Sequence, residues 1–340
     1  MNGKIADRSN EITEEMWEDV NDFNKFIVED FLDNQTHLSE KSIIVYRSAL
    51  RIFFVWVKDN LQNKKCIDIK KKEFLRYINW LVKRGFSESG IKFKKSAVSS
   101  LNKFIENFYE DEYPTFRNFV TSEIQIPKTG NVFQKEPLTP EEVQHLCDEL
   151  EKRGEWQKIA YIKFTYSTGC RRAESRQLLK EVVNYEPKRK TIEIVDENGL
   201  KHNVESVSYK THDIRCKGRS TQGKIRKLQF GEDVMQVLKK WLEVRGEDDC
   251  PYMFVVKQKN GEVRQVGEGI FNDWCIGEFS EIVGKRLTPH GLRRSRATNL
   301  ILYDHRSLET AQKLLGHESS ETTQIYVIRE DSDDADEAFI

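Results

Sequence analysis

Six side chains in the second half of this sequence are of the types that suit phosphoryl transfer. Arginine offers a fork of N–H donors that binds two phosphate oxygens at once, whereas a lysine ammonium acts only as a point charge. A tyrosine hydroxyl can attack phosphorus, and histidine and lysine can carry the protons that such a reaction moves. In chain order the six are Arg171, Lys217, His290, Arg293, His317 and Tyr326.

The strongest local pattern is Thr288-Pro-His-Gly-Leu-Arg293. A threonine followed by proline predicts the start of a helix, which places His290 in the first turn and Arg293 on the same face. A helix N-terminus presents free amides and the positive end of the helix dipole, so it is suited to hold a phosphate. A lone His-x-x-Arg is usually a surface pair; the capped helix and the motif that follows favour a phosphate site.

Two further motifs flank this helix start. In Thr168-Gly-Cys-Arg-Arg-Ala-Glu174, the carboxylate of Glu174 is one turn from Arg171 and can hold its guanidinium. Such a pair is more often a plain surface ion pair, so it indicates a phosphate site only together with the other motifs. Later, a helix capped by Ser307 ends in Leu-Leu-Gly-His317, and Tyr326 follows on a further helix; taken alone, this tyrosine would be a half-buried packing residue.

The order and spacing of these residues resemble those of the tyrosine recombinases, the family that includes Cre, the Xer proteins and phage integrases. The resemblance covers about residues 14–328 and rests on Thr-Gly-x-Arg-x-x-Glu, His-x-x-Arg and Leu-Gly-His-x8-Tyr. It implies that Tyr326 is the nucleophile, that Arg171, Arg293 and His290 stabilise the five-coordinate phosphate, and that His317 supports the same oxygens or the tyrosine. Glu174 is then a supporting residue.

The resemblance also implies a lysine that protonates the leaving 5′ oxygen from a hairpin between two strands. Lys217, in Arg-Cys-Lys-Gly-Arg219, is the preferred candidate, and Lys210 and Lys224 compete for the role. Desolvation of a lysine in a site that DNA closes would lower its pKa toward a useful range. Alternatively Lys217, like Arg219, contacts the DNA backbone.

Hydrophobic periodicity predicts a mainly α protein with two domains: an all-α core-binding domain and an α+β catalytic domain with a small antiparallel sheet. The boundaries expected are a disordered N-terminus at 1–13, a helical DNA-binding domain at 14–120, a linker at 121–137, a catalytic domain at 138–328 and an acidic tail at 329–340. Helices are predicted at 12–31, from Ser39 to Val57, and at 70–83, 91–108, 155–167, 171–180, 232–245 and 267–283, besides those that begin at Thr139, Thr288 and Ser307; strands are predicted at 191–195, 204–209 and 225–230.

The net charge of −1 hides an uneven distribution. The stretch 330–340 holds six acids and no base, so residues 1–329 carry a net charge of +5. Six bases stand against one acid in 83–103, and seven against one in 206–227. Local clusters of charge, rather than the net charge, set the electrostatic potential that DNA encounters. On the helix 91–108 the predicted DNA-binding residues are Lys92, Lys95 and Lys103. Charge alone would favour an ordinary solvated face, and only the motifs further along the chain favour contact with DNA.

Several classes of protein are excluded by composition. The longest apolar run, Ile52–Val57, is too short to span a bilayer, and no secretion signal opens the chain. The six cysteines form no Cys-x-x-Cys pair, which favours reduced thiols in a cytoplasm over metal or disulfide use. Composition thus predicts no membrane span, and the resemblance implies a reaction that uses no cofactor, no metal and no small-molecule substrate.

The resemblance implies a site-specific recombinase that cuts and rejoins double-stranded DNA as a homotetramer on inverted-repeat core sites. Only about a dozen residues precede the first helix, so an arm-binding domain is not expected. The alternatives are a type IB-like topoisomerase and, from another class, a DNA-binding regulator without catalysis. The acidic tail after Tyr326 either docks through Phe339 and Ile340 on a neighbouring protomer or is simply disordered.

Overall fold

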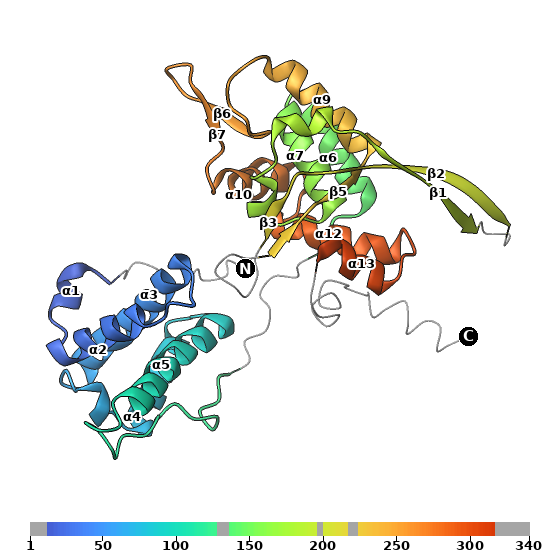
Figure 1. The fold of residues 1–340 in the computed structure, drawn as a ribbon. Coiled ribbons are helices and arrows are strands. Elements are labelled where there is room, and N and C mark those ends of the chain that lie inside the picture. Colours follow the sequence, from blue (N-terminus) through green and yellow to red (C-terminus); the bar gives the residue numbers. More distant parts are fainter. Residues whose placement is uncertain (1–11, 128–135, 196–199, 217–223, 317–340) are drawn as a thin grey trace. The chain divides into compact units, whose positions relative to one another are not determined.

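The computed structural model describes residues 12–127, 136–195, 200–216 and 224–316 of the chain. The chain divides into two compact units, residues 1–134 and 135–340 (Figure 1). The first is helical and the second combines helices with small antiparallel sheets. This combination confirms the predicted fold class.

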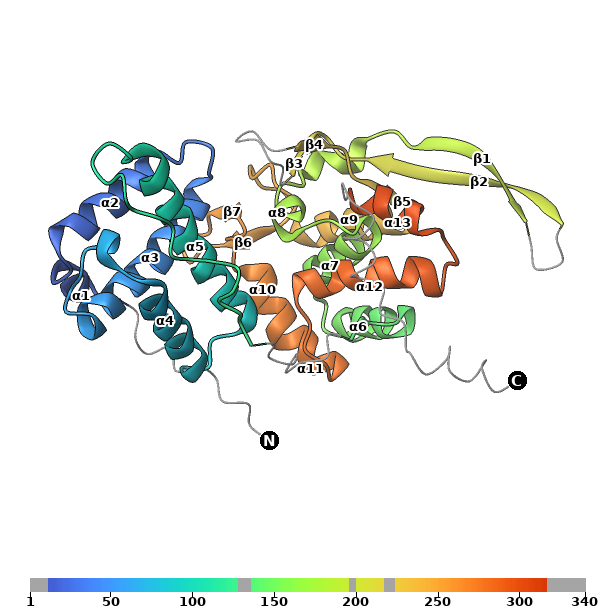
Figure 2. The ribbon, with the colours of Figure 1, turned by 90° about the horizontal axis from the view of Figure 1, so that it is seen from below.

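The first unit is built from five α-helices and one 3₁₀ turn among its described residues (Figure 2). The helices are α1 (Glu14–Glu18), α2 (Asp22–Asp33), α3 (Glu40–Asn60), α4 (Lys71–Lys83) and α5 (Glu88–Phe108), and the 3₁₀ turn is Cys66–Asp68. Their apolar faces enclose an aromatic centre in which Phe53, Phe54, Phe74 and Tyr77 are fully buried. This packing follows the helical spacing of the apolar residues.

The single helix predicted at 12–31 is instead two helices, α1 and α2. Asn21 interrupts it, because its side-chain oxygen caps α2 at the Asn24 amide, 2.9 Å away, while its side-chain amide donates to the carbonyl of Asn63 at 2.6 Å. At the end of the segment 1–13, Thr13 caps α1 and Ile12 packs on the core. Residues 1–11 lie outside the described residues.

The predicted linker at 121–137 begins with residues that pack on the first unit. Ile124 is 3% exposed in the core of that unit, and its carbonyl accepts a hydrogen bond from Lys95. Residues 128–135 of the linker lie outside the described part of the chain.

The second unit places its helices around α7 (Trp156–Thr168). The others are α6 (Pro140–Lys152), α8 (Arg172–Ser175), α9 (Glu232–Arg245), α10 (Ile270–Trp274), α11 (Ser280–Val283), α12 (Pro289–Leu302) and α13 (Leu308–Leu315), with a 3₁₀ turn at Lys180–Asn184 and a π turn at Cys275–Phe279. The predicted capping box of Thr139 and Glu142 is confirmed at the start of α6. Leu138 ties this start to α12, because its amide donates to Ser295 and its carbonyl accepts from Asn299.

Two helices predicted in this unit are shorter than expected. The helix expected at 171–180 ends after the single turn of α8, because the backbone of Leu178 and Lys180 pairs with that of Met253 and Pro251. The helix expected at 267–283 is divided into α10, the π turn and α11, and the backbone departs from helical angles at Gly277 (ψ −107°).

The described strands form three small antiparallel sheets. One has the order β1-β2-β5, from β1 (Lys188–Val195), β2 (Lys201–Lys210) and β5 (Gln229–Gly231); the others pair β3 (Ile214–Cys216) with β4 (Lys224–Arg226), and β6 (Val255–Lys257) with β7 (Val263–Gln265). The strand predicted at 225–230 is thus two strands in two sheets. The backbone of Leu228 between them pairs with Thr211, which joins the sheets.

The hairpin of β1 and β2 extends beyond the helices of its unit (Figures 1 and 2). Its base packs on the unit, since Tyr209 stacks on Phe230 and donates to Glu232. Further out, the described side chains of residues 188–193 and 201–205 are all exposed. No helix in the described part of the chain is long and apolar enough to cross a membrane, and all six cysteines are free thiols.

Replacement of Asn24 by alanine should destabilise the first unit. Asn24 is fully buried; its amide donates to the Lys64 carbonyl at 2.8 Å and its oxygen accepts from the Cys66 amide at 2.8 Å. Leaving these groups unpaired costs about 1–3 kcal/mol. Hydrogen exchange of peptides from residues 60–70 measures the loss. The exposed Asn34, replaced in the same way, should change exchange little, and equal effects of both replacements would contradict this account.

Candidate active site

Arg293 on α12 is almost fully buried, at 1% exposure. Its guanidinium donates to the carbonyl of Gly169 at 2.5 Å and to the carbonyl of Leu315 at 2.9 Å. These two carbonyls end α7 and α13. Arginine side chains satisfy the unpaired carbonyls at helix ends, so Arg293 joins three helices in one place.

Gly169 is required at this position by its backbone and by its neighbours. Its φ of 58° is in the left-handed region, which favours glycine. A Cβ added here would lie 2.7 Å from Cδ2 of Leu315, so the buried Leu315 side chain would have to shift. The turn at Gly169 directs its carbonyl to Arg293 and begins the short segment that carries Arg171.

Arg171 precedes α8 as its N-terminal cap and is partly exposed, with 34% of its side chain accessible. Its Nη1 donates to Oε1 of Glu174 at 3.0 Å, and its backbone amide donates to Oε2 of the same carboxylate at 3.0 Å. Glu174 is only 1% exposed. The predicted support of Arg171 by Glu174 is therefore present as a direct contact that fixes both the backbone and the side chain of the arginine.

Arg226 on β4 is a residue of this site that the sequence analysis missed. Its Nη2 donates to Glu174 at 2.8 Å, its Nη1 to the carbonyl of Leu314 at 3.0 Å, and its Nε lies 3.2 Å from Sγ of Cys216. In the sequence it is one base among the seven in 206–227. The sequence holds no signal for it, because the burial of Glu174, which requires more positive charge than one half-exposed arginine supplies, is seen only in the structure.

The carboxylate of Glu174 stays ionised because of these donors. Burial by itself would raise its pKa, but the amide of Arg171 and the guanidinium of Arg226 outweigh burial and hold the pKa below its ordinary value. Three guanidiniums and one carboxylate therefore meet here, which leaves the site with excess positive charge. Such a site is complementary to a phosphate.

A groove of about 340 Å³ opens beside these residues, at the start of α12. Thr288 caps this helix by accepting from the Gly291 amide at 2.9 Å, and Pro289 occupies the first turn, as predicted. His290 is exposed at the groove. The lining consists of Arg171, Arg172, Ala173, Asn272, Thr288, Pro289, His290 and Arg293. The structure thus brings together three of the six predicted residues: Arg171, His290 and Arg293.

The other three predicted residues, Lys217, His317 and Tyr326, lie outside the described residues, as do Arg219 and the acidic tail. The anchors of their segments are described. Cys216 pairs with Lys224 at the last described step of the β3–β4 hairpin, and α13 ends at Gly316 (φ 67°), where a Cβ would lie 2.6 Å from Nη1 of Arg226. Of the competing lysines, Lys224 and Lys210 are exposed at strand ends.

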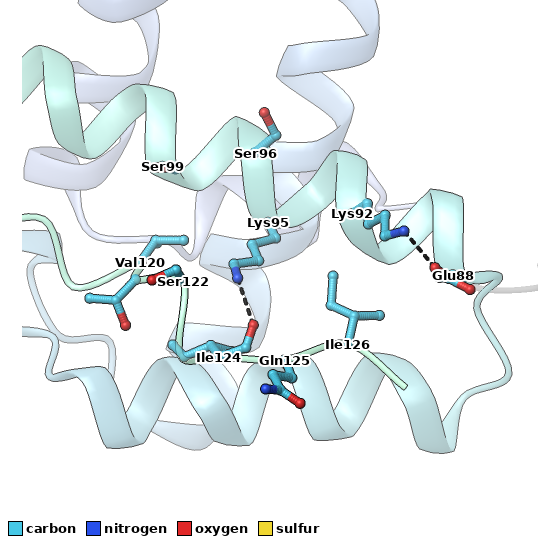
Figure 3. A pocket seen from close by; sticks show the side chains of 11 residues that line it. Glu88, Lys92, Lys95, Ser96, Ser99, Val120, Ser122, Ile124, Gln125 and Ile126 are labelled. Carbon is cyan, nitrogen blue, oxygen red and sulfur yellow. Dashed lines mark hydrogen bonds and ion pairs between the residues drawn. The ribbon is translucent and has the colours of Figure 1, made fainter. Parts of the chain in front are cut away.

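Two of the three predicted DNA-binding lysines of α5, Lys92 and Lys95, line a groove of about 560 Å³ in the first unit (Figure 3). Lys95 points to the carbonyl of Ile124 and donates to it at 2.6 Å, while Lys92 forms an ion pair with Glu88 one turn earlier (Figure 3). Lys103 is exposed further along α5. The ammonium of Lys95 therefore has a structural partner within its own unit, which the sequence analysis did not anticipate.

Comparison with known proteins identifies the family. Residues 136–332 match the phage integrase family, and residues 28–107 match the phage integrase N-terminal SAM-like domain. The chain belongs to the phage integrase family. It is 32% identical over 336 residues to the SPbeta prophage-derived recombinase-like protein YomM of Bacillus subtilis (strain 168), covering 97% of this chain and 95% of that protein. The predicted family, the tyrosine recombinases, is therefore confirmed.

Other members of the integrase family share less sequence but the same fold. Tyrosine recombinase XerA of Pyrococcus furiosus is 27% identical over 255 residues, 75% of each chain. The Tn1549 transposon integrase in complex with circular intermediate DNA has a TM-score of 0.62 at 16% identity, covering 94% of this chain and 99% of that one. The XerH recombinase bound to palindromic difH substrate has a TM-score of 0.61 at 20% identity, covering 88% and 79%.

Replacement of Glu174 by glutamine should destabilise the second unit. Removing one partner of a buried ion pair costs about 3–5 kcal/mol, because the remaining guanidiniums lose their counter-charge. The lowered pKa of Glu174 means that its stabilisation is present above its unfolded pKa and is lost as pH falls through the folded value. The free energy of unfolding of the variant should therefore approach that of the wild type as pH falls below about 4.3.

Urea unfolding of both proteins at pH 7 and at lower pH measures this difference. The matched control is Glu309→Gln, whose carboxylate is 71% exposed in its pair with Lys313. It should cost less than about 1 kcal/mol at any pH. A loss for Glu174→Gln no greater than the control's would show that the buried carboxylate is not needed.

Proposed function

We propose that this protein is a site-specific DNA recombinase that cuts and rejoins DNA through a 3′-phosphotyrosyl intermediate. The observation that carries the proposal is the groove at the start of α12, where Arg171, His290 and Arg293 meet. A scissile phosphate in this groove would meet the positive end of the α12 dipole and the guanidiniums of Arg171 and Arg293. Such preorganised donors stabilise the charge that develops as phosphorus becomes five-coordinate.

In the proposed reaction the hydroxyl of Tyr326 attacks the phosphorus and its proton passes to His290. The bond from phosphorus to the 5′ oxygen breaks, and Lys217 donates a proton to that oxygen. His317 supports the phosphate oxygens or the tyrosine. The new ester retains the energy of the broken phosphodiester, so the reverse attack by a 5′ hydroxyl rejoins the strand without ATP.

Glu174 and Arg226 act in this proposal as positioning residues. Glu174 holds Arg171 at the groove, and Arg226 joins Glu174 to the last turn of α13 through the Leu314 carbonyl. His317 and Tyr326 follow α13 in the chain. Arg226 also lies at the base of the β3–β4 hairpin, between whose strands Lys217 stands in the sequence. One guanidinium thus contacts the segments that lead to Lys217, His317 and Tyr326.

Double-stranded DNA is the proposed partner, bound as inverted-repeat core sites by a homotetramer. XerH was solved on a palindromic difH substrate and the Tn1549 integrase on circular intermediate DNA, and both share this fold. In the first unit we propose Lys92 and Lys103 on α5 as phosphate contacts. Lys95 would join these contacts after DNA binding releases its ammonium from the Ile124 carbonyl.

Replacement of Tyr326 by phenylalanine should abolish the covalent adduct with DNA and leave DNA affinity within about twofold, because only the attacking oxygen is lost. Denaturing gels of reactions on nicked target DNA measure the adduct, and gel shifts measure the affinity. The control is Tyr303→Phe, a tyrosine 47% exposed after α12, which should form adduct normally. An adduct that persists in Tyr326→Phe would refute the mechanism.

The same assays separate the alternatives. Relaxation of any supercoiled plasmid without a defined site would indicate a topoisomerase. A wild-type protein that binds DNA but forms no adduct would indicate a regulator without catalysis.

Replacement of Lys217 by alanine should slow cleavage of ordinary DNA by about 10²–10⁴-fold, the usual contribution of a general acid. A substrate with sulfur in place of the bridging 5′ oxygen should restore the rate, because a thiolate leaves without a proton. Single-turnover cleavage of both substrates measures this. The matched variants are Lys210→Ala and Lys224→Ala, and rescue by sulfur in one of these instead would assign the acid to that lysine.

A further inference from the structure

The sheet of β1, β2 and β5 has two faces that differ in charge. Residues opposite each other in an antiparallel pair lie on the same face, and successive residues alternate. Lys188 is opposite Ser208, Lys190 opposite Ser206, and Ile192 opposite Val204. Lys210, opposite Gln229, belongs to the same face. We call this the outer face; its described side chains are Lys188, Lys190, Ile192, His202, Val204, Ser206, Ser208, Lys210 and Gln229.

The inner face is the one that packs on the unit. Tyr209 and Phe230 are opposite each other on this face, and both are buried. Phe230 contacts Phe164 of α7, and Tyr209 donates to Glu232 of α9. The outer face is therefore turned away from these two helices.

Charges on the inner face are paired with each other. Arg189 lies 3.2 Å from Glu205, and Lys201 lies 2.8 Å from Glu193. Among the described residues, the outer face has three lysines and a histidine but no carboxylate. Lys188 and Lys190 therefore lie on the outer face and Arg189 on the inner face, although the three residues are consecutive in the sequence.

A two-stranded hairpin exposed on both faces is marginally stable in water. The cross-strand pair of Ile192 and Val204 contributes to the stability of this one. The lysines of the outer face repel each other, so they do not stabilise the hairpin. Their arrangement is explained by a partner of opposite charge.

We propose that the outer face of the β1–β2 hairpin binds the phosphate backbone of duplex DNA. The proposal rests on the proposed function and extends it to a surface that includes none of the six proposed catalytic residues. Lysines without acids attract phosphates, and serine and glutamine side chains donate to phosphate oxygens. Two-stranded ribbons also have the width to lie along a DNA groove.

The course of the chain supports the binding of duplex DNA at the outer face. β2 continues through Thr211 to β3, and β4 continues through Leu228 to β5; the two paths are joined where Thr211 and Leu228 pair. Two strands of the outer face, β2 and β5, are therefore continuous with β3 and β4, the strands that flank Lys217 in the sequence. DNA that reaches the site beside this hairpin would extend along the outer face, so the surface would bind DNA next to the cleaved bond.

The alternation of faces gives a matched test in three consecutive residues. Lys188→Gln with Lys190→Gln removes two charges from the outer face, whereas Arg189→Gln removes a charge from the inner face between them. The full chain is titrated into a fluorescent 60-base-pair duplex of arbitrary sequence, and binding is measured by anisotropy at several salt concentrations. Circular dichroism and thermal melting of each variant establish that it is folded.

The double variant should bind about 10- to 30-fold more weakly near 0.15 M salt, with a slope of log K against log salt that is smaller by about 1.8, or about 0.9 for each lost phosphate contact. Arg189→Gln should retain the wild-type slope. Equal slopes in all three proteins would overturn the proposal, as would a change in self-association of the double variant by sedimentation without a change in DNA affinity.

Failure of this inference is distinguishable from failure of the proposed function. A wild-type chain that forms the Tyr326 adduct, with unchanged binding in the double variant, would refute the outer face alone. A wild-type chain that neither binds DNA nor forms an adduct would refute both.

Discussion

The buried carboxylate of Glu174 is the interaction on which the candidate site depends. A carboxylate removed from water is costly unless its oxygens are matched by donors, and here a backbone amide and two guanidiniums supply them. These contacts hold Arg171 at the groove, and they hold Arg226 where it connects β4 to the end of α13. The same ion cluster that stabilises the second unit also arranges the groups proposed to bind phosphate.

The end of α13 is the second constraint, and it is set by the same side chains. Arg293 and Arg226 bind the successive carbonyls of Leu315 and Leu314, and Gly316 then turns the chain in the left-handed region. Because helix ends leave carbonyls unpaired, two arginines can determine where the helix stops and in which direction the chain leaves it. In the proposed mechanism this exit leads to His317 and Tyr326, so phosphate binding and delivery of the nucleophile share one set of contacts.

Charge in this protein is organised locally, and the total hides it. The net charge of −1 is compatible with a DNA-binding protein because basic residues gather on particular surfaces. Even within those surfaces, the structure assigns different roles to neighbouring bases. Lys95 binds a carbonyl of its own unit, Arg226 binds a buried carboxylate, Arg189 pairs with Glu205 across a hairpin, and Lys188 and Lys190 face outward without an acid.

Local signals in the sequence determined the fold class, most helices and the motif set that identifies the family. Caps such as Thr139 and Thr288, the spacing of apolar residues on α3 and the glycine ends of α7 and α13 act over a few residues, so they can be read without a fold. Only the tertiary structure decided that Arg226 shares Glu174 with Arg171, that Arg293 binds the ends of two helices, and that 225–230 divides between two sheets. Each of these contacts joins two groups that are tens of residues apart in the sequence. Contacts between buried charges and backbone groups at such separations produce no periodic pattern of residue types, so the sequence alone does not predict them.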